Sequence, residues 1–364
     1  MQSKSIFFLV PYPKGKAPSQ RFRFEQYLEI LKENEYRFKI KSFYSSKAWD
    51  ILHREGNVLL KIIYIGISFL FRVKHLLSSL SYKYVFIHRE VSPIGPPFFE
   101  WILAKVFRKK IIYDFDDAIW LPNYSEANTG FHKLKNYQKV NKIMQWSDLI
   151  SCGNQYLSEY ASKYNSNVVI NPTTIDTVNY HNTQLYNYKV EKNKVVIGWT
   201  GTHTTIKYLE FLKPILEKLK ESFKFEFCVI SNEHPNLNLP NLNFIKWQKD
   251  TEILDLMKFD IGVMPLSNNK WAKGKCGFKA LQYMSLGIPT VASPVGVNID
   301  IINEGENGFL CDTQEEWLTA LTFLLIKEEN RTDMSESAKQ KIKDDFSVLS
   351  NKHNFLSLFN IKKK

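Results

Sequence analysis

The sequence contains few cysteines, and none of them forms a metal-binding or redox motif. Its four cysteines stand far apart, at positions 152, 228, 276 and 311, and no C-x-x-C spacing occurs. Isolated thiols of this kind argue against a disulfide framework and against a zinc site, and they suit a reducing compartment. The net charge of +12 comes without zinc-finger spacing or an RNA-recognition motif. The basic excess therefore fits a membrane surface or a phosphate-bearing substrate better than a nucleic acid.

Long hydrophobic runs are also missing. The first apolar run, 6–10, ends at Pro11 and is too short for a signal peptide, which favours a cytoplasmic protein. The strongest apolar stretch, 58–71 (VLLKIIYIGISFLF), is interrupted by Lys61 and falls short of the ~20 residues of a membrane-spanning helix. Two interpretations stay open. The pattern favours a buried or amphipathic helix of the first domain, and the alternative is a helix that could attach the chain peripherally to the inner face of a membrane.

What the sequence does contain is a regular alternation of β-rich runs with helical patterns. Helical spacing is clear, for example, in Phe24, Tyr27, Leu28 and Leu31. Such an alternation predicts parallel sheets covered by helices, and it occurs in each half of the chain. The predicted strands are 6–10, 38–43, 84–88, 110–115, 149–152 and 168–171 in the first half, and 195–200, 225–230, 244–247, 261–264, 290–292 and 309–311 in the second.

A polar run rich in Asn, Thr and Tyr separates the two halves, near 171–193. We therefore predict an α/β fold of two Rossmann-like lobes that face each other across a cleft, with ligands beyond the carboxyl ends of the strands. The predicted division is a first lobe over 1–175, a linker over 176–192, a second lobe over 193–345, and a carboxy-terminal helix over 346–364 that could pack back on the first lobe.

Residues 271–294, WAKGKCGFKALQYMSLGIPTVASP, form the most informative segment. A loop with glycines, which let a backbone approach a ligand closely, leads into a helix expected over 278–286. A helix N-terminus favours an anion, and Lys275, Lys279 and Gln282 have the i, i+4, i+7 spacing of one helical face. We interpret the segment as a diphosphate cradle, with Gln282 reaching a hydroxyl pair such as a ribose. An ordinary solvated basic face is the alternative.

Residues 195–207, VVIGWTGTHTTIK, combine a β run with a glycine turn. Gly201 at the strand end, followed by hydroxyl side chains, again suits the close approach of a phosphate. The dinucleotide fingerprint G-x-G-x-x-G is incomplete, because Gly198 and Gly201 are not followed by the third glycine. This disfavours a nicotinamide-dependent dehydrogenase.

Three carboxylates gather at the end of the predicted strand 110–115. Asp114, Asp116 and Asp117 stand within four residues, at a cost in like-charge repulsion. Metal binding, acid–base or sugar-hydroxyl contacts, and an Asp-rich helix start all stay open for them.

Two further polar groups follow strands of the first half. Arg21 and Arg23 come after the first strand and could clamp a phosphate. His88 and Glu90 lie at the end of another strand. Surface arginines at a helix start, and a structural histidine, are the alternative interpretations.

Taken together, these segments resemble the group 1 glycosyltransferases (family 4), which are retaining enzymes of the GT-B fold. The resemblance is greatest to the bacterial branch that assembles surface polysaccharides. It implies metal-independent transfer of a sugar from a nucleoside-diphosphate sugar to a glycan or lipid-linked acceptor, with no cofactor and no nucleic acid. It is carried by GKCGFKALQYMSLGIPTVASPVGVN, IIYDFDDAIW, PSQRFRFEQYL and IGWTGTHTTIKYLE.

The sequence departs from the family pattern at four positions. The family's two glutamates, eight positions apart, fall on Gly274 and Gln282, its frequent arginine falls on Thr202, and its first-lobe histidine falls on Asp116. The missing glutamates motivate a second hypothesis, a catalytically degenerate module that binds a nucleotide or glycan without turnover.

The motifs and the resemblance together assign residues to three roles and none to a metal. Catalysis is assigned to Asp116, Asp117 and Lys279; donor binding to Gly201, Thr202, Lys207, Trp247, Lys275, Gly277, Phe278, Lys279 and Gln282; and acceptor binding to Arg21, Arg23, His88 and Glu90.

Overall fold

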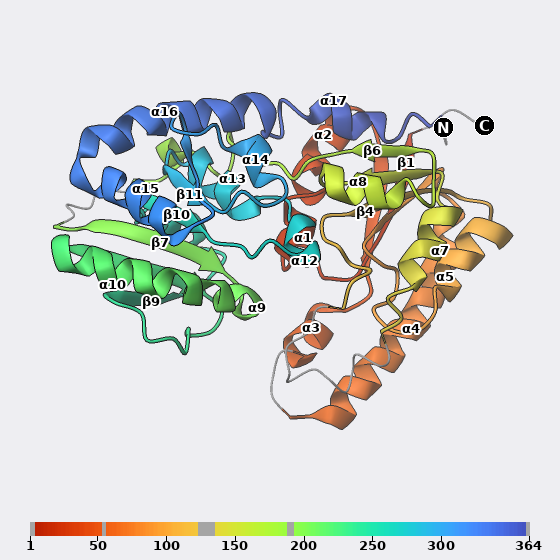
Figure 1. The fold of residues 1–364 in the computed structure, drawn as a ribbon. Coiled ribbons are helices and arrows are strands. Elements are labelled where there is room, and N and C mark those ends of the chain that lie inside the picture. Colours follow the sequence, from red (N-terminus) through yellow and green to blue (C-terminus); the bar gives the residue numbers. More distant parts are fainter. Residues whose placement is uncertain (1–3, 53–55, 123–134, 188–192, 362–364) are drawn as a thin grey trace. The chain divides into compact units, whose positions relative to one another are not determined.

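The computed structural model of the chain describes residues 4–52, 56–122, 135–187 and 193–361. It comprises two compact units: unit 1 is Met1–Thr173 with Lys352–Lys364, and unit 2 is Thr174–Asn351. Among the described residues, each unit is built on its own six-stranded sheet with helices packed on it (Figure 1). The predicted α/β fold with two Rossmann-like lobes is confirmed, and every strand predicted from the sequence is present.

The sheet of unit 1 is parallel throughout. Its strands are β1 (Ser5–Val10), β2 (Arg37–Ser42), β3 (Tyr84–His88), β4 (Lys110–Phe115), β5 (Leu149–Cys152) and β6 (Val168–Ile170), in the order β2-β1-β3-β4-β5-β6. All residues of β1 and of β3 are buried. Strands covered on both faces need apolar residues at consecutive positions, which explains their unbroken apolar runs.

The last described helix of the chain belongs to unit 1. The helices of unit 1 are α1 (Pro18–Arg21), η1 (Glu25–Tyr27), α2 (Leu28–Glu33), α3 (Ser46–Leu52), α4 (Val58–Ser79), α5 (Phe98–Trp101), the π-helix η2 (Ile102–Val106), α7 (Lys139–Trp146), α8 (Gln155–Ala161) and α17 (Lys352–Ser357). Phe355 of α17 stacks on Tyr27, with ring centroids 4.2 Å apart. The helix covers only part of the predicted 346–364, and residues 346–351 belong to unit 2. Residues 362–364 lie outside the described residues.

Unit 2 has a second parallel sheet with a core on each face. Its strands are β7 (Val195–Gly201), β8 (Phe225–Ser231), β9 (Leu242–Lys246), β10 (Ile261–Met264), β11 (Thr290–Ala292) and β12 (Gly308–Leu310), in the order β12-β11-β10-β7-β8-β9. Side chains alternate along β7: Ile197 packs in one core with Trp317, and Val196 packs in the other with Phe259. The helices are η4 (Thr183–Leu185), α9 (His203–Ile206), η5 (Lys207–Leu212), α10 (Lys213–Ser222), α11 (Glu252–Leu256), α12 (Lys270–Lys273), α13 (Phe278–Ser285), α14 (Asn298–Ile301), α15 (Gln314–Ile326) and α16 (Glu328–Asp345).

Residues 176–187, from the predicted linker, pack on unit 2. Tyr180 and Tyr186 contact one of its cores, and the Tyr180 hydroxyl donates to Glu252 Oε2 at 2.7 Å. Aromatic side chains within an otherwise polar run therefore attach this segment to unit 2. The rest of the predicted linker, 188–192, lies outside the described residues.

Helix α4 forms over the apolar stretch for which the sequence predicts a buried or amphipathic helix. It is 22 residues long, and its Leu59 and Leu70 side chains are 73% and 74% exposed. No helix in the described parts of the chain is both long and apolar enough to cross a bilayer. Full burial is therefore excluded, because a large part of the apolar surface of α4 faces solvent, while an amphipathic helix and a membrane-surface helix stay open.

Candidate functional site

In both sheets the first strand of the chain is an interior strand. The next one or two strands are added on one side of it, and the later strands are added on the other side. One pair of neighbouring strands in each sheet therefore has connections that lead in opposite directions: β1 and β3 in unit 1, and β7 and β10 in unit 2. Open α/β sheets bind ligands beyond the carboxyl ends of such a pair. These ends are Val10 and His88 in unit 1, and Gly201 and Met264 in unit 2. Each unit thus has one edge at which a ligand is expected, called its ligand edge below.

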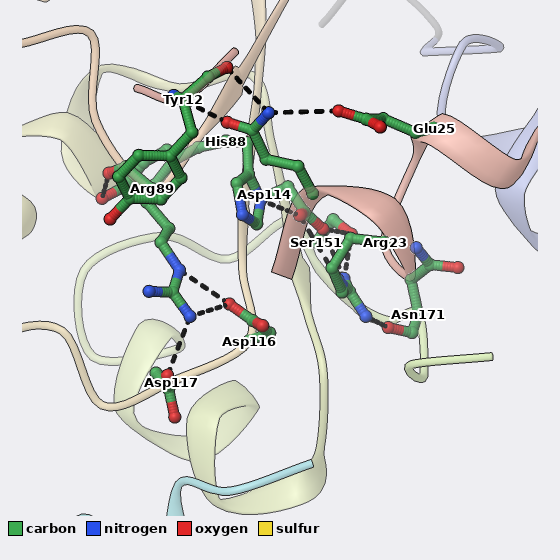
Figure 2. Close-up of polar contacts among 12 residues, drawn as sticks. Tyr12, Arg23, Glu25, His88, Arg89, Asp114, Asp116, Asp117, Ser151 and Asn171 are labelled. Carbon is green, nitrogen blue, oxygen red and sulfur yellow. Dashed lines mark hydrogen bonds and ion pairs between the residues drawn. The ribbon is translucent and has the colours of Figure 1, made fainter. Parts of the chain in front are cut away.

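Asp114 is the centre of a buried polar cluster at the ligand edge of unit 1 (Figure 2). The parallel register places it between His88 on β3 and Ser151 on β5. Nδ1 of His88 lies 2.8 Å from one carboxylate oxygen of Asp114, and the Ser151 hydroxyl donates to the other at 2.7 Å. Arg23, in the turn between α1 and η1, donates Nε to the same carboxylate at 3.3 Å and forms an ion pair with it. Three neighbouring strands and one turn thus converge on a single carboxylate.

The partners of Asp114 determine its charge. Burial by itself raises the pKa of the Asp114 carboxyl, but the charge of Arg23 and the hydrogen bond from His88 lower this pKa by more, so that it lies well below its usual value. Asp114 is therefore ionised opposite Arg23. The Arg23 guanidinium also donates to the carbonyl oxygen of Asn171, which ties the turn to the residue after β6.

The structure corrects two of the predicted acceptor contacts. The side chains of Arg23 and His88 have no exposed surface, and both are bound to Asp114. Neither can meet an acceptor at the surface, so we assign both a structural role at the carboxyl ends of β3, β4 and β5. Glu90 is engaged as well, because it pairs with Lys139 at 2.9 Å. The guanidinium of Arg21 lies 4.9 Å from the centre of the Phe22 ring, and its acceptor contact stays a prediction.

Arg89, directly after β3, has a backbone conformation that is rare for a residue with a side chain. Its φ is +60°, in the left-handed region, which costs about 1–3 kcal/mol and persists only where neighbours enforce it. Here the Arg89 amide donates to the Asp114 carbonyl oxygen at 2.7 Å, and the Tyr113 hydroxyl donates to the Arg89 carbonyl oxygen at 2.6 Å. Such strain is concentrated at functional sites, so Arg89 is a candidate that the sequence motifs missed.

Arg89 holds the other two carboxylates of the cluster. Its Nε donates to Asp116 and its Nη2 to Asp117, both at 2.8 Å (Figure 2). Burial raises the pKa of Asp116, but Arg89, His88 and Arg23 together lower it below its usual value. Burial in turn lowers the pKa of Arg89, while Asp116 and Asp117 raise it well above its ordinary value. In the described parts of the chain, no three His, Cys, Asp or Glu side chains come together as a metal site would require.

In unit 2, β7 ends in the predicted glycine turn. A Cβ on Gly201 would lie 2.4 Å from the Trp199 ring and 2.8 Å from the Thr205 hydroxyl, so packing leaves no room for a side chain. Thr202 follows as an exposed residue, 2.8 Å from Thr204 between hydroxyl oxygens. The glycine thus serves packing, and it also keeps the backbone uncovered at the ligand edge.

Helix α13 begins beside the end of β7. Its Tyr283 hydroxyl accepts a hydrogen bond from the Thr200 amide at 2.8 Å. Nζ of Lys279 lies 5.5 Å from the centre of the Trp199 ring, and Nζ of Lys275 lies 4.8 Å from that of Trp271. A helix N-terminus carries partial positive charge. The Lys279 ammonium group and a helix N-terminus therefore lie near the end of β7, and Lys275 lies in the loop directly before that helix.

Gly277 determines how this segment enters the helix. Its φ is +65°, a conformation that favours glycine, and a Cβ there would lie 2.1 Å from Ile301. Because α13 begins only at Phe278, Lys275 precedes the helix. The prediction that Lys275, Lys279 and Gln282 share one helical face is therefore wrong, although both lysines lie near the helix start.

Gln282 is 1% exposed, and its Nε2 lies 3.3 Å from Nε2 of His181. This contact joins α13 to a residue 101 positions away. No local spacing in the sequence could have found His181. The predicted ribose contact of Gln282 stays a prediction, and it requires the ribose to share this amide with His181.

Two other predicted donor residues lie farther along the same unit. Trp247 follows β9, and its Nε1 donates to Glu252 at 3.2 Å while its ring packs on a core. Lys207 is exposed at the start of η5, with Nζ 5.7 Å from the centre of the Tyr208 ring. Neither contact contradicts donor binding, and both assignments stay predictions.

Residues 227–341 match the family model described as glycosyl transferases group 1. This segment extends from β8 into α16, and it contains α13 and the loop before it. Among curated protein sequences, none matches the chain.

Solved structures with a similar fold cover nearly the whole chain. A glycosyltransferase from Rickettsia africae has a TM-score of 0.69 at 13% identity, with 99% of this chain and 98% of that chain covered. Sucrose-phosphate synthase from Thermosynechococcus elongatus has a TM-score of 0.69 at 11% identity, with 99% and 100% covered. Anabaena HepE in complex with UDP and glucose has a TM-score of 0.63 at 11% identity, with 98% and 99% covered. The fold is that of the GT-B proteins, and within it residues 227–341 of the second unit are similar to the group 1 glycosyltransferases.

Proposed function

We propose that the chain transfers a sugar from a nucleoside-diphosphate sugar to a glycan or lipid-linked acceptor, with retention at the anomeric carbon, in the assembly of a surface polysaccharide. The observation that carries the donor assignment is the N-terminus of α13 near the end of β7, with Lys279 on that helix and Lys275 in the loop directly before it. The complex of Anabaena HepE with UDP and glucose supports a nucleotide sugar as the donor. Retention and the role in polysaccharide assembly rest on the resemblance to the family.

The leaving diphosphate explains why positive charge is needed at this edge. Negative charge grows on the diphosphate oxygen as the glycosidic bond of the donor breaks, so groups aimed at that oxygen bind the transition state more strongly than the ground state. Lys275 and Lys279 supply full charges, and the helix N-terminus supplies a partial one. Gly201 and Gly277 let the backbone approach the phosphates, while Thr202, Phe278 and Gln282 are the proposed contacts to the rest of the donor.

Unit 1 is the proposed acceptor side. Asp116 and Asp117 can accept hydrogen bonds from sugar hydroxyls, and Arg89 binds both carboxylates and holds them in position. We assign catalytic contact with the reacting sugar to Asp116 and Asp117. Arg89 is a positioning residue, because it acts through these two carboxylates.

A second candidate function is binding without turnover. Two observations favour it: Gly274 stands where the family has a carboxylate, and Gln282 is buried against His181. Such a module would still bind the nucleotide through Lys275 and Lys279. The two functions therefore differ in turnover and not in donor affinity.

Screening nucleotide sugars by thermal shift, followed by transfer assays, tests the proposal. We expect one UDP-, GDP- or ADP-sugar to raise the unfolding temperature, and we expect release of nucleoside diphosphate to increase when a glycan or lipid-linked acceptor extract is added. Stabilisation without release of diphosphate in any extract would favour the binding module. A stabilising effect of NAD alone would contradict both.

Activity should survive removal of divalent cations. The lysines and the helix N-terminus are proposed to replace a metal at the diphosphate, while Asp116 and Asp117 are already compensated by Arg89. We expect turnover with EDTA to equal turnover with added Mg²⁺ or Mn²⁺ within about twofold, since no charge is lost from the leaving-group site. If EDTA abolishes turnover and a divalent cation restores it, the proposed mechanism is wrong.

A further inference from the structure

Helix α4 carries apolar residues on both of its sides, whereas an ordinary surface helix turns a polar side to solvent. Its inward side packs Ile65 and Phe69 against a core cluster and also buries the polar Ser68 and Arg72. Arg72 donates to the carbonyl oxygens of Lys41 and Val10, both at 2.9 Å. This buried arginine attaches α4 to the carboxyl ends of β1 and β2, and it fixes the rotation of the helix so that apolar side chains point outward.

The exposed side of α4 carries large apolar residues along its whole length. They recur at helical spacing, as in Leu59, Ile63, Ile67 and Leu70, and a patch of this size on a soluble surface marks an interaction site. We name this set the α4 surface; it consists of Val58, Leu59, Leu60, Ile62, Ile63, Ile67, Leu70, Phe71, Val73 and Leu77.

Positive charge lies beside the C-terminal half of the α4 surface. No Asp or Glu occurs between residues 56 and 89, and Lys74 is exposed on α4 itself. His75 lies among cations: its pKa is lowered to about 4 by burial and then by the charges of Arg72, Lys41, Lys39 and Lys74. Glu100 of α5 is the acid that acts on this helix, and it is buried beside Arg72. An exposed apolar side next to cations is typical of helices that bind anionic membranes.

The neighbouring helix α5 adds aromatic residues. Phe69 of α4 stacks with Phe99 of α5, with ring centroids 5.9 Å apart. Phe98 and Trp101 of α5 are 57% and 43% exposed. Aromatic side chains are enriched at the headgroup level of bilayers, so they fit the same kind of partner.

We propose that α4 docks unit 1 on a bilayer that contains anionic lipid, with the helix lying in the headgroup region and the α4 surface inserted. Its 22 residues would extend roughly 33 Å along the membrane. A second copy of the chain is a poorer occupant, because a symmetric contact would bring the same cations together with no acid between them. The proposal does not depend on sugar transfer, but such docking would bring the chain to a lipid-linked acceptor.

Sedimentation of the full chain with vesicles tests the proposal. We expect binding to vesicles of phosphatidylglycerol and phosphatidylcholine, weaker binding to phosphatidylcholine alone, and loss of the difference at high salt. The Leu59→Ser/Leu70→Ser variant should lower partitioning to the anionic vesicles by about 100-fold, at about tenfold for each leucine. Lys74→Glu should lower it by about tenfold at low salt only.

The matched control is Ile299→Ser/Ile326→Ser, which removes two isoleucines of unit 2 that are 56% and 57% exposed. It should bind vesicles like the unchanged chain, and thermal unfolding should show that all variants fold. Equal recovery in the supernatant with every vesicle and salt concentration would overturn the proposal. So would a concentration-dependent dimer that the double leucine variant abolishes while vesicle binding is absent, because the occupant would then be a second copy.

Discussion

Alanine in place of Lys279 should lower turnover at saturating donor by about 30- to 1000-fold. The ammonium group lies at the start of α13 beside Trp199, where we place the leaving diphosphate. One charge-assisted contact that acts on the transition state is worth about 2–4 kcal/mol, and each 1.36 kcal/mol is tenfold in rate. The loss should appear mainly in kcat, because negative charge on the diphosphate grows during bond breaking.

Lys220→Ala is the matched control for this experiment. Lys220 is exposed on α10 shortly before β8 begins, and therefore lies at the opposite, amino edge of the same sheet. Its removal takes away one charge from unit 2 but none from the proposed site, so turnover should stay within about twofold. A Lys279→Ala enzyme with near-normal kcat would remove the lysine from the mechanism.

Methionine in place of Arg23 should destabilise unit 1 by about 3–5 kcal/mol. The change leaves the carboxylate of Asp114 buried with only His88 and Ser151 as partners, and an uncompensated buried charge is costly. Urea unfolding followed by a probe in unit 1 measures the effect. Donor affinity, which we assign to unit 2, should be unchanged.

Lys39→Met, on an exposed position of β2, is the control, and it should change stability by less than about 0.5 kcal/mol. If Arg23→Met instead leaves stability intact and raises the KM for the acceptor, the original prediction of an acceptor contact is right and the structural assignment is wrong.

The ion pair between Arg23 and Asp114 should also make the stability effect of Arg23→Met depend on pH. The folded pKa of Asp114 lies below its unfolded value of about 3.9, so the ion pair stabilises the protein above that pH. As the pH falls below about 4 toward the folded pKa, this contribution is lost. The stability difference between the unchanged chain and Arg23→Met should therefore narrow in acid.

The strands and their order of appearance could be predicted because buried parallel strands need consecutive apolar residues. The runs 6–10 and 84–88 are strands for this reason, and both are fully buried. The glycine loop before α13 could also be predicted from local sequence. The left-handed φ at Gly277 favours glycine, so the conformation of the loop is visible in the residue type.

The remaining features depend on contacts that no local pattern contains. The side chain of Arg23 could have pointed to the surface or to Asp114. It meets Asp114 because the register of β3, β4 and β5 places that carboxylate there, and this register is defined only in the assembled sheet. Arg89 looks like an ordinary strand-end residue until its φ is known. The apolar stretch 58–71 predicts a helix, but the direction in which it faces is determined by one buried residue, Arg72.

The return of α17 to unit 1 has a consequence for the way the chain is made. Phe355, Leu358 and Phe359 are at most 1% exposed in the core of unit 1, yet they are translated after all of unit 2. Nascent domains usually complete folding in their order along the chain. Here residues 174–351 can close their sheet on the ribosome while Tyr27 and Tyr84 still lack their aromatic partners. A growing chain is therefore expected to carry a finished unit 2 before a finished unit 1, the reverse of the order in which the two begin.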